Sequence, residues 1–259
     1  MSPVPYPEFN DGVAIVAGGS GGSGTAIVRD LARCGADVAL TYHANRAAAE
    51  ALADDVARAG RTAQIGRLDL QDAEATRFFV DDVVARFGRL HSVVYAAGPP
   101  LTLDFISRLT PETWSKVFRA DVDGCFNLIW ACLPHLKRQG AGSVVAVITA
   151  AVDRPPPKDI LSAAPKAAIQ ALIRGLAREE GRNGIRANCV GPGWIDAGLG
   201  AQAMAGLDQA PYIDCFLAQI PLRRVGLAEE IAQAVTFLLS DRAQYVTGAT
   251  LPVAGGLQL

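Results

Sequence analysis

The sequence lacks the charge excess that is typical of nucleic-acid-binding proteins. Among its 259 residues, 24 Lys and Arg are balanced by 26 Asp and Glu, which gives a formal net charge of -2. A chain this close to neutral has no general electrostatic attraction for polyanions or anionic membrane surfaces. We therefore expect neither nucleic acid nor membrane as a partner.

Long hydrophobic runs are also missing. No stretch approaches the ~18 uninterrupted apolar residues of a membrane span. The first twelve residues contain three prolines and two acids, without the apolar centre of a signal peptide. We interpret residues 1–10 as a Pro-rich arm and expect a cytoplasmic protein.

Cysteine is scarce, and no two cysteines form a CxxC pair. The five cysteines are far apart in the sequence and lie in apolar runs, where cysteine behaves as a small hydrophobic residue. We predict buried free thiols of a reducing compartment, with no disulfide framework and no metal site. These residues are Cys34, Cys125, Cys132, Cys189 and Cys215.

Hydrophobic residues make up 50% of the chain. They form short continuous runs, typical of buried strands, which alternate with segments whose apolar residues have helical spacing. Alternation of this kind favours right-handed crossovers, and hence a doubly wound α/β domain with a mainly parallel sheet, here over residues 11–259. The predicted strands are 13–17, 37–42, 62–65, 92–96, 143–148, 185–190 and 250–253. The predicted helices are about 22–34, 45–59, 72–87, 111–138, 163–182 and 228–239.

A glycine-rich loop follows the first predicted strand and opens the first helix. Its sequence is Ala17-Gly18-Gly19-Ser20-Gly21-Gly22-Ser23-Gly24. Glycines let the backbone approach a pyrophosphate, whose charge is met by the free N–H groups at the start of the helix. The alternative is a flexible turn that binds no ligand.

The spacing Gly18-x-x-x-Gly22-x-Gly24 resembles the TGxxxGxG loop of the short-chain dehydrogenase/reductase family, and further matches make the resemblance extend over about residues 10–259. It implies a Rossmann-type fold with a seven-stranded parallel sheet and a nicotinamide cofactor. The other matching segments are Asp69-Leu70, Ala96-Ala97-Gly98, Asn188 to Ile195 and Val246-Thr247-Gly248. The implied cofactor-binding residues are Gly18, Ser20, Gly22, Ser23, Gly24, Asp69, Leu70, Ala96, Ala97, Gly98, Lys166, Pro192, Gly193 and Ile195.

The end of the second strand bears on the choice of cofactor. NAD-using enzymes place an acid there for the adenosine ribose, but Thr41 to Arg46 contains no carboxylate. Arg46 can pair with a 2′-phosphate, helped by His43, Asn45 and Ser20, so we expect NADP(H) rather than NAD(H). The alternative is that Arg46 only lies in the first turn of a solvent-exposed helix and binds no phosphate.

The catalytic positions implied by the resemblance are altered. Family members carry a Tyr-x-x-x-Lys pair, a serine after the fifth strand and an asparagine in the preceding long helix. Lys166 matches the lysine, whereas Ser162 stands at the tyrosine position, Thr149 at the serine position and Asp121 at the asparagine position. We treat Lys166, Thr149, Ser162 and Asp121 as the candidate catalytic residues.

The sequence therefore leaves several candidates for the proton donor. A serine hydroxyl is far less acidic than a phenol, and Ser162 also fits an N-cap, because Pro165 would fall in the first turn of a helix from about 163. Thr149 can polarise a substrate oxygen. Asp153 and Asp159 are other candidate acids, and Tyr95 and Tyr212 are remote ones.

The segment 198–224 occupies the position of the family's substrate lid. Its apolar side is consistent with a hydrophobic or aromatic substrate and equally with a helix that packs on the core. The resemblance also implies a homodimer or homotetramer formed through the helices at about 111–138 and 163–182.

The leading hypothesis is an NADP(H)-dependent oxidoreductase that acts on a carbonyl or enoyl substrate with an atypical proton donor. The alternative is an inactive or repurposed non-redox member that binds a nucleotide, such as a partner subunit. A third interpretation is an isomerase-like or dehydratase-like enzyme that uses the acids of the crevice. The fold alone does not decide among them.

Overall fold

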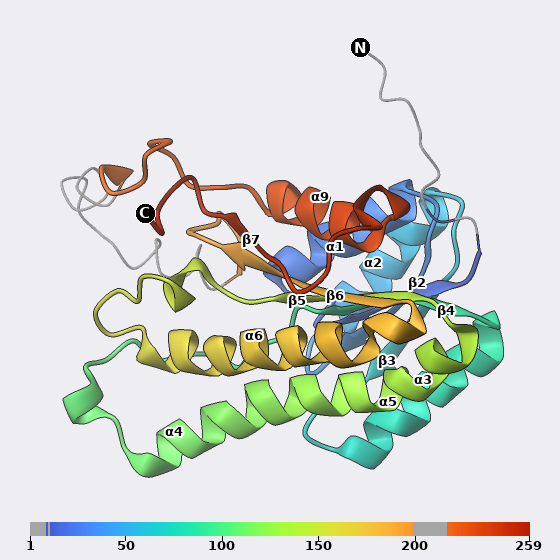
Figure 1. Cartoon of the computed structure of the whole chain (residues 1–259), viewed down its shortest axis with the longest axis horizontal. Helices are drawn as coiled ribbons and strands as arrows, with labels where there is room; N and C mark the ends of the chain where they lie inside the picture. Colours follow the sequence, from blue (N-terminus) through green and yellow to red (C-terminus); the bar gives the residue numbers. More distant parts are fainter. Residues whose placement is uncertain (1–8, 10, 199–216) are drawn as a thin grey trace.

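The computed structural model describes residue 9, residues 11–198 and residues 217–259. A seven-stranded sheet runs through these residues in the order β3-β2-β1-β4-β5-β6-β7, and every neighbouring pair of strands is parallel (Figure 1). The strand order reverses between β1 and β4, which places a crevice beyond the carboxyl ends of these strands. The strands are β1 (Val13–Ala17), β2 (Asp37–Tyr42), β3 (Ala63–Arg67), β4 (Leu90–Tyr95), β5 (Gly142–Val147), β6 (Ile185–Pro192) and β7 (Thr250–Val253).

Helices cover both faces of the sheet, as Figure 1 shows. One face carries α1 (Gly22–Arg33), α2 (Arg46–Arg58) and α9 (Ala228–Leu239). The other carries α3 (Ala73–Phe87), α5 (Gly124–Gln139) and α6 (Ile160–Glu180). Because both faces are covered, strand residues of either orientation are buried, which explains the continuous apolar runs of the sequence.

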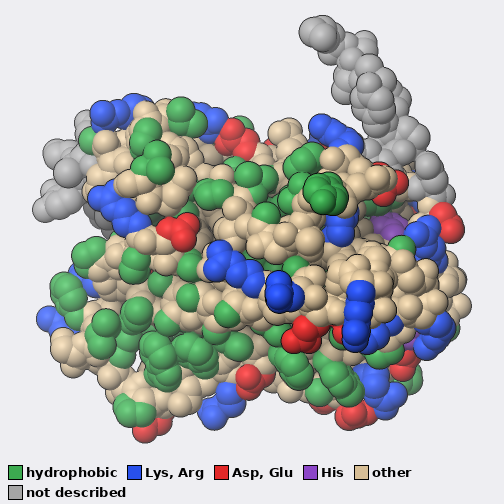
Figure 2. Space-filling model, in the orientation of Figure 1, with side chains coloured by type: hydrophobic (Ala, Val, Ile, Leu, Met, Phe, Trp, Pro, Cys, Tyr) green, Lys and Arg blue, Asp and Glu red, His purple; other side chains and the backbone are tan. Residues whose placement is uncertain are grey.

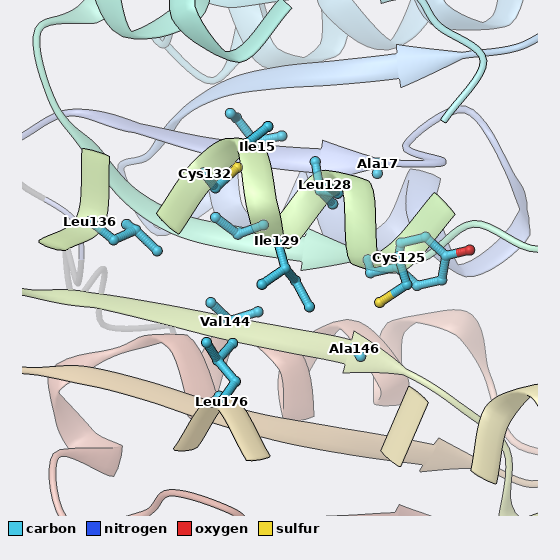
Figure 3. Packing of buried hydrophobic residues seen from close by; sticks show 14 of the residues in the cluster. Ile15, Ala17, Cys125, Leu128, Ile129, Cys132, Leu136, Val144, Ala146 and Leu176 are labelled. Carbon is cyan, nitrogen blue, oxygen red and sulfur yellow. The ribbon is translucent and has the colours of Figure 1, made fainter. Parts of the chain in front are cut away.

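The core on the α5 side illustrates this packing. In Figure 3, Leu128 and Cys132 of α5 lie over Ile15 of β1, and Ile129 of the same helix points toward Val144 of β5. All five side chains are at most 6% exposed. Helix α5 is therefore fixed against the two strands that flank β4.

The long helix predicted at 111–138 is interrupted. Thr110 caps α4 (Pro111–Phe118) as its sequence indicates, with its hydroxyl accepting from the backbone N–H of Thr113 at 3.2 Å. A π-helical turn over Arg119–Asp123 then separates α4 from α5. Such wide turns are frequent at functional sites, and this one places Asp121 in the interior at 3% exposed.

The part of the N-terminal arm that the structure describes is Phe9, which is 7% exposed and stacks on His91 with ring centroids 4.9 Å apart. Residues 1–8 and 10 lie outside the described residues. Burial lowers the pKa of His91 to about 4, so this imidazole is neutral near pH 7.

Burial also accounts for the state of three cysteines. Cys125, Cys132 and Cys189 are buried free thiols, and burial raises the pKa of each, which keeps them protonated. Cys34 is only half-buried, so the prediction of a buried thiol is wrong at this position, and Cys215 lies outside the described residues. No helix among the described residues has the length and apolar character needed to cross a membrane.

Candidate active site

The glycine loop between β1 and α1 folds back on itself. Gly18 has a φ of 77°, and its N–H donates to Thr41 Oγ1 at 3.1 Å. A Cβ added to Gly24 would collide with the Gly18 carbonyl oxygen. Only glycine fits both positions, so the loop's composition follows from its path.

The start of α1 has no side-chain cap. Gly21 occupies the N-cap position and offers no side chain to the first amides of the helix. The backbone N–H groups of Gly22, Ser23 and Gly24 belong to this first turn, which has no intrahelical acceptor. Together with the positive end of the helix dipole, these groups suit a pyrophosphate.

Two other segments meet the glycine loop at the carboxyl edge of the sheet. A Cβ on Gly18 would lie 2.8 Å from the carbonyl oxygen of Ala96, so the turn after β4 packs directly on the loop. A Cβ on Gly22 would lie 2.6 Å from the nitrogen of Gly198, beyond β6. The sequence motifs are therefore brought together in space.

The remaining predicted cofactor residues flank this junction. Asp69 and Leu70 follow β3, and the Asp69 carboxylate accepts from the backbone N–H of Gln71 at 3.0 Å. Pro192 ends β6. Gly193 donates its N–H to the Val253 carbonyl at 3.0 Å, and Ile195 is 6% exposed. Each lies at or just after the carboxyl end of a strand, where a dinucleotide binds in such sheets.

The end of β2 carries polar side chains that already have partners. Asn45 caps α2, with Oδ1 accepting from the Ala48 N–H at 3.0 Å. Arg46 pairs with Glu50 through an Nε to Oε1 distance of 2.7 Å, and both side chains are exposed. His43 is exposed as well. The i,i+4 spacing of Arg46 and Glu50 is the sequence signal for this pair, which the sequence reasoning missed.

The ammonium group of Lys166, in α6, is held by several contacts. It donates to Asp121 Oδ1 at 2.8 Å and to the carbonyl oxygen of Ala97 at 3.1 Å. It also lies 5.0 Å from the ring centroid of Tyr95. The Lys166 side chain is 12% exposed and that of Asp121 is 4% exposed. These contacts fix the ammonium beside the turn of Ala96-Ala97-Gly98.

The other two candidate catalytic residues, Thr149 and Ser162, lie on separate elements. Thr149 follows β5, and its Oγ1 accepts from the Ala151 N–H at 3.2 Å, which leaves the hydroxyl proton available to donate. Ser162 lies in α6 four residues before Lys166, and both are half-buried. This spacing puts the two side chains on one face of the helix.

The prediction that Ser162 caps its helix is wrong. Helix α6 begins at Ile160 with Asp159 at the N-cap position, so Ser162 is already in the first turn, and its N–H donates to the Asp159 carbonyl at 3.0 Å. The predicted start at about 163 lies too far along the chain, because proline is favoured in the first turn of a helix whereas Pro165 is accommodated inside this one. The presence of Ser162 is therefore not explained by capping.

The sequence offers four further candidate acids. Burial raises the pKa of Asp159 to about 6, so a fraction of the protein molecules carries a protonated Asp159 carboxyl near neutral pH. Asp153 is exposed at the end of the short helix after Thr149. Tyr95 is 1% exposed, and burial together with the nearby Asp121 carboxylate raises its pKa well above the usual value. Tyr212 lies outside the described residues, as does most of the lid segment 198–224.

Comparisons with known proteins bear on this arrangement. Residues 18–258 match the family model described as enoyl-(acyl carrier protein) reductase. The chain is 32% identical over 249 residues to the 3-oxoacyl-[acyl-carrier-protein] reductase FabG of Staphylococcus aureus, covering 95% of this chain and 98% of the relative.

Solved structures agree with the sequence matches. A short-chain type dehydrogenase/reductase from Mycobacterium ulcerans superimposes with a TM-score of 0.90 at 28% identity, covering 96% of this chain and 90% of the other. The chain belongs to the short-chain dehydrogenase/reductase family. An NAD+-bound xylitol dehydrogenase is also similar, with a TM-score of 0.90, 28% identity, and coverage of 96% of this chain and 99% of the other.

Membership in the short-chain dehydrogenase/reductase family makes the chain an oxidoreductase of that type. The uncapped start of α1 and the glycine contacts around it fit a dinucleotide pyrophosphate. The His, Cys, Asp and Glu side chains of the described residues form no group of three that could hold a metal ion. Lys166, Asp121, Thr149 and Ser162 remain the candidate catalytic residues.

Proposed function

We propose that the protein is an NADP(H)-dependent reductase that acts on a carbonyl or enoyl substrate with an atypical proton donor. The observation that carries the proposal is Lys166, whose ammonium donates to Asp121 at 2.8 Å and to the carbonyl oxygen of Ala97 at 3.1 Å, in the turn that packs on the glycine loop. The name of the FabG relative supports a 3-oxo thioester as the first substrate class to examine. A bound nicotinamide supplies the hydride, and the chain's own residues orient the cofactor and the substrate oxygen.

The preference for NADP(H) rests on the end of β2. Thr41 to Arg46 contains no carboxylate to accept from the adenosine ribose hydroxyls. Arg46 and Glu50 are both more than half exposed, at 71% and 52% for their side chains. Exposed pairs of this kind contribute little to stability, so a 2′-phosphate can take over the guanidinium at little cost.

Arg46→Ala should weaken NADPH binding about tenfold to a hundredfold and leave NADH binding unchanged, because only NADPH carries the phosphate that the guanidinium would bind. Calorimetric titration of both nucleotides checks this. Arg77→Ala is a matched control, since Arg77 also forms an exposed ion pair on a helix, with Glu74 at 2.6 Å. A wild-type protein that binds both nucleotides equally, or prefers NADH, would remove the assignment.

We also propose which residues supply the proton. Ser162 occupies the tyrosine position of the family, and its alcohol is too weak an acid to replace the phenol directly. Thr149 Oγ1 accepts from the Ala151 N–H and can donate its own proton to a substrate carbonyl. Asp159 is a second candidate because burial raises the pKa of its carboxyl to about 6.

A competing function follows from Ser162. If no group replaces the phenol, the fold binds a nucleotide without net hydride transfer and serves as a repurposed member. Binding of NADPH without turnover of any carbonyl or enoyl substrate would favour this second function.

We also propose a homodimer or homotetramer that forms through α4 and α5. Three large aromatic side chains stay exposed there: Trp114 at 38%, Phe126 at 51% and Trp130 at 42%. Figure 2 shows hydrophobic side chains gathered over this part of the molecule, at the lower left. Burial of such a surface against a second copy is the usual role of a large exposed apolar patch.

A further inference from the structure

The chain connections that follow β4 and β5 meet beyond the ends of these strands. Residues 96–110 connect β4 to α4, and residues 148–159 connect β5 to α6. Because β4 and β5 are parallel neighbours, both connections start side by side at the carboxyl edge of the sheet (Figure 1). They come together again where Lys158 Nζ of the second lies 5.0 Å from the ring centroid of Phe105 in the first.

Phe105 holds a second cation as well. The guanidinium carbon of Arg108 lies 5.6 Å from the same ring centroid. An aromatic ring attracts a cation through its quadrupole and carries no net charge, so it holds the cation without neutralising it. Arg46 on α2 differs, because the Glu50 carboxylate lies 2.7 Å from it. Both cations at Phe105 are therefore available to a third, negatively charged group.

Few carboxylates compete for these two cations. Within the described part of the chain Lys158 pairs with no carboxylate, and Arg108 pairs only with Asp104, at 3.6 Å. The side chains of Lys158 and Arg108 are exposed, and the Phe105 ring between them is half-exposed at 45%. An anion from solution can reach both charges.

The backbone fixes Lys158 in place. Its φ of 72° lies in the left-handed region, which residues other than glycine rarely adopt. Pro155, Pro156 and Pro157 come directly before it, and each proline ring restricts its own φ. Strained backbone of this kind is frequent at residues that clamp a ligand. The loop therefore presents its cation at a defined place, which lowers the entropy lost on binding.

We propose that Lys158 and Arg108 bind an anionic group, a phosphate or a carboxylate, at the end of the substrate remote from the reacting carbonyl. The inference rests on the proposed reductase function and adds a substrate class to it. Thr149 lies in the same connection as Lys158, so a substrate whose oxygen lies at Thr149 can extend along this connection to the two cations. Phe105 acts as a positioning residue, because its ring holds both cations.

The test uses two matched pairs of ligands that differ in the anion. One pair is the 3-oxobutanoyl thioester of phosphopantetheine and that of pantetheine, and the other is a long-chain keto acid and its methyl ester. Calorimetry would measure their affinities for the protein loaded with NADP+, which has no hydride to transfer. A preference of the wild-type protein within the first pair indicates a phosphate, and one within the second pair a carboxylate.

Lys158→Met should weaken binding of the preferred anionic ligand about threefold to tenfold, and Lys158→Met combined with Arg108→Met about tenfold or more. The neutral member of the pair should stay within about twofold of wild type, and the loss should shrink at high salt, because salt screens exposed charges. Lys158→Arg keeps the charge and should bind like the wild type. Phe105→Leu should give a smaller loss, again for the anionic member only.

Arg86→Met is the matched control. Arg86 also lies over an aromatic ring, at 5.2 Å from the centroid of Phe87, but it is in α3 and not in either connection. It should leave all four affinities unchanged. If the wild-type protein does not prefer either anionic ligand, or the double variant loses affinity equally for charged and neutral members, the anion site is wrong. Anion-dependent binding without any reduction by NADPH would instead leave the site standing and overturn the proposed function.

Discussion

Replacing Ser162 with tyrosine should create or raise NADPH-dependent ketone reduction by about 100-fold or more. A positioned general acid contributes ~10²–10⁴ in rate, and α6 already presents residue 162 four positions before Lys166. Thr149 lies after β5, where it can hold the substrate oxygen. The measurement is steady-state turnover of a ketone panel with NADPH.

The controls for this substitution separate the effect of the phenol hydroxyl from that of the aromatic ring. Ser162→Phe adds the same bulk without a hydroxyl and should stay at the wild-type rate. Ser162→Ala should cost little stability, because Asp159 and not Ser162 occupies the N-cap position. If Ser162→Ala abolishes turnover in a folded protein, the serine itself is catalytic. A folded Ser162→Tyr variant that binds NADPH and gains no rate would refute the tyrosine-position assignment.

Replacing Lys166 with methionine should lower NADPH affinity about tenfold or more and abolish turnover. The substitution removes the ammonium group and leaves Asp121, whose side chain is 4% exposed, without its cation. A stranded buried charge destabilises a fold by about 3–5 kcal/mol. Chemical denaturation and nucleotide titration would measure the two effects.

A second variant keeps this prediction testable if the first one unfolds. Lys166→Met combined with Asp121→Asn removes the stranded carboxylate and should recover stability without recovering NADPH affinity. Lys137→Met is the matched control, because Lys137 pairs with Glu180 at 3.1 Å away from the crevice. If the folded double variant binds NADPH as tightly as the wild type does, Lys166 does not contact the cofactor.

The parts of the fold that the sequence predicts are those governed by local pattern. Val13 to Ala17 is a continuous apolar run, and it forms a strand buried on both faces. The glycines after it are required by the backbone path, so their spacing carries the information directly. Thr110 followed by Pro111 marks a helix start in the same local way.

The parts that were missed depend on tertiary contacts. The π-helical turn at Arg119–Asp123 has no signal in helical periodicity, and the start of α6 was displaced because Pro165 is tolerated inside the helix. The partners of Asp121 lie 26 and 45 residues away in the sequence. No local pattern indicates that Tyr95, proposed as a remote proton donor, instead binds the carboxylate that holds Lys166.

The most direct measurement of the central claim is deuteride transfer from NADPH that carries deuterium at both C4 positions of the nicotinamide. The protein would be incubated with deuterated NADPH and a panel of ketones, 3-oxo thioesters and enoyl thioesters, and the products analysed by mass spectrometry. The wild-type protein is expected to give products with one deuterium on the reduced carbon. Ser162→Tyr should form the deuterated ketone products about 100-fold faster or more, and the folded Lys166→Met, Asp121→Asn variant should form none. NADPH binding without deuterium transfer to any substrate would contradict the account and favour a nucleotide-binding protein without redox activity.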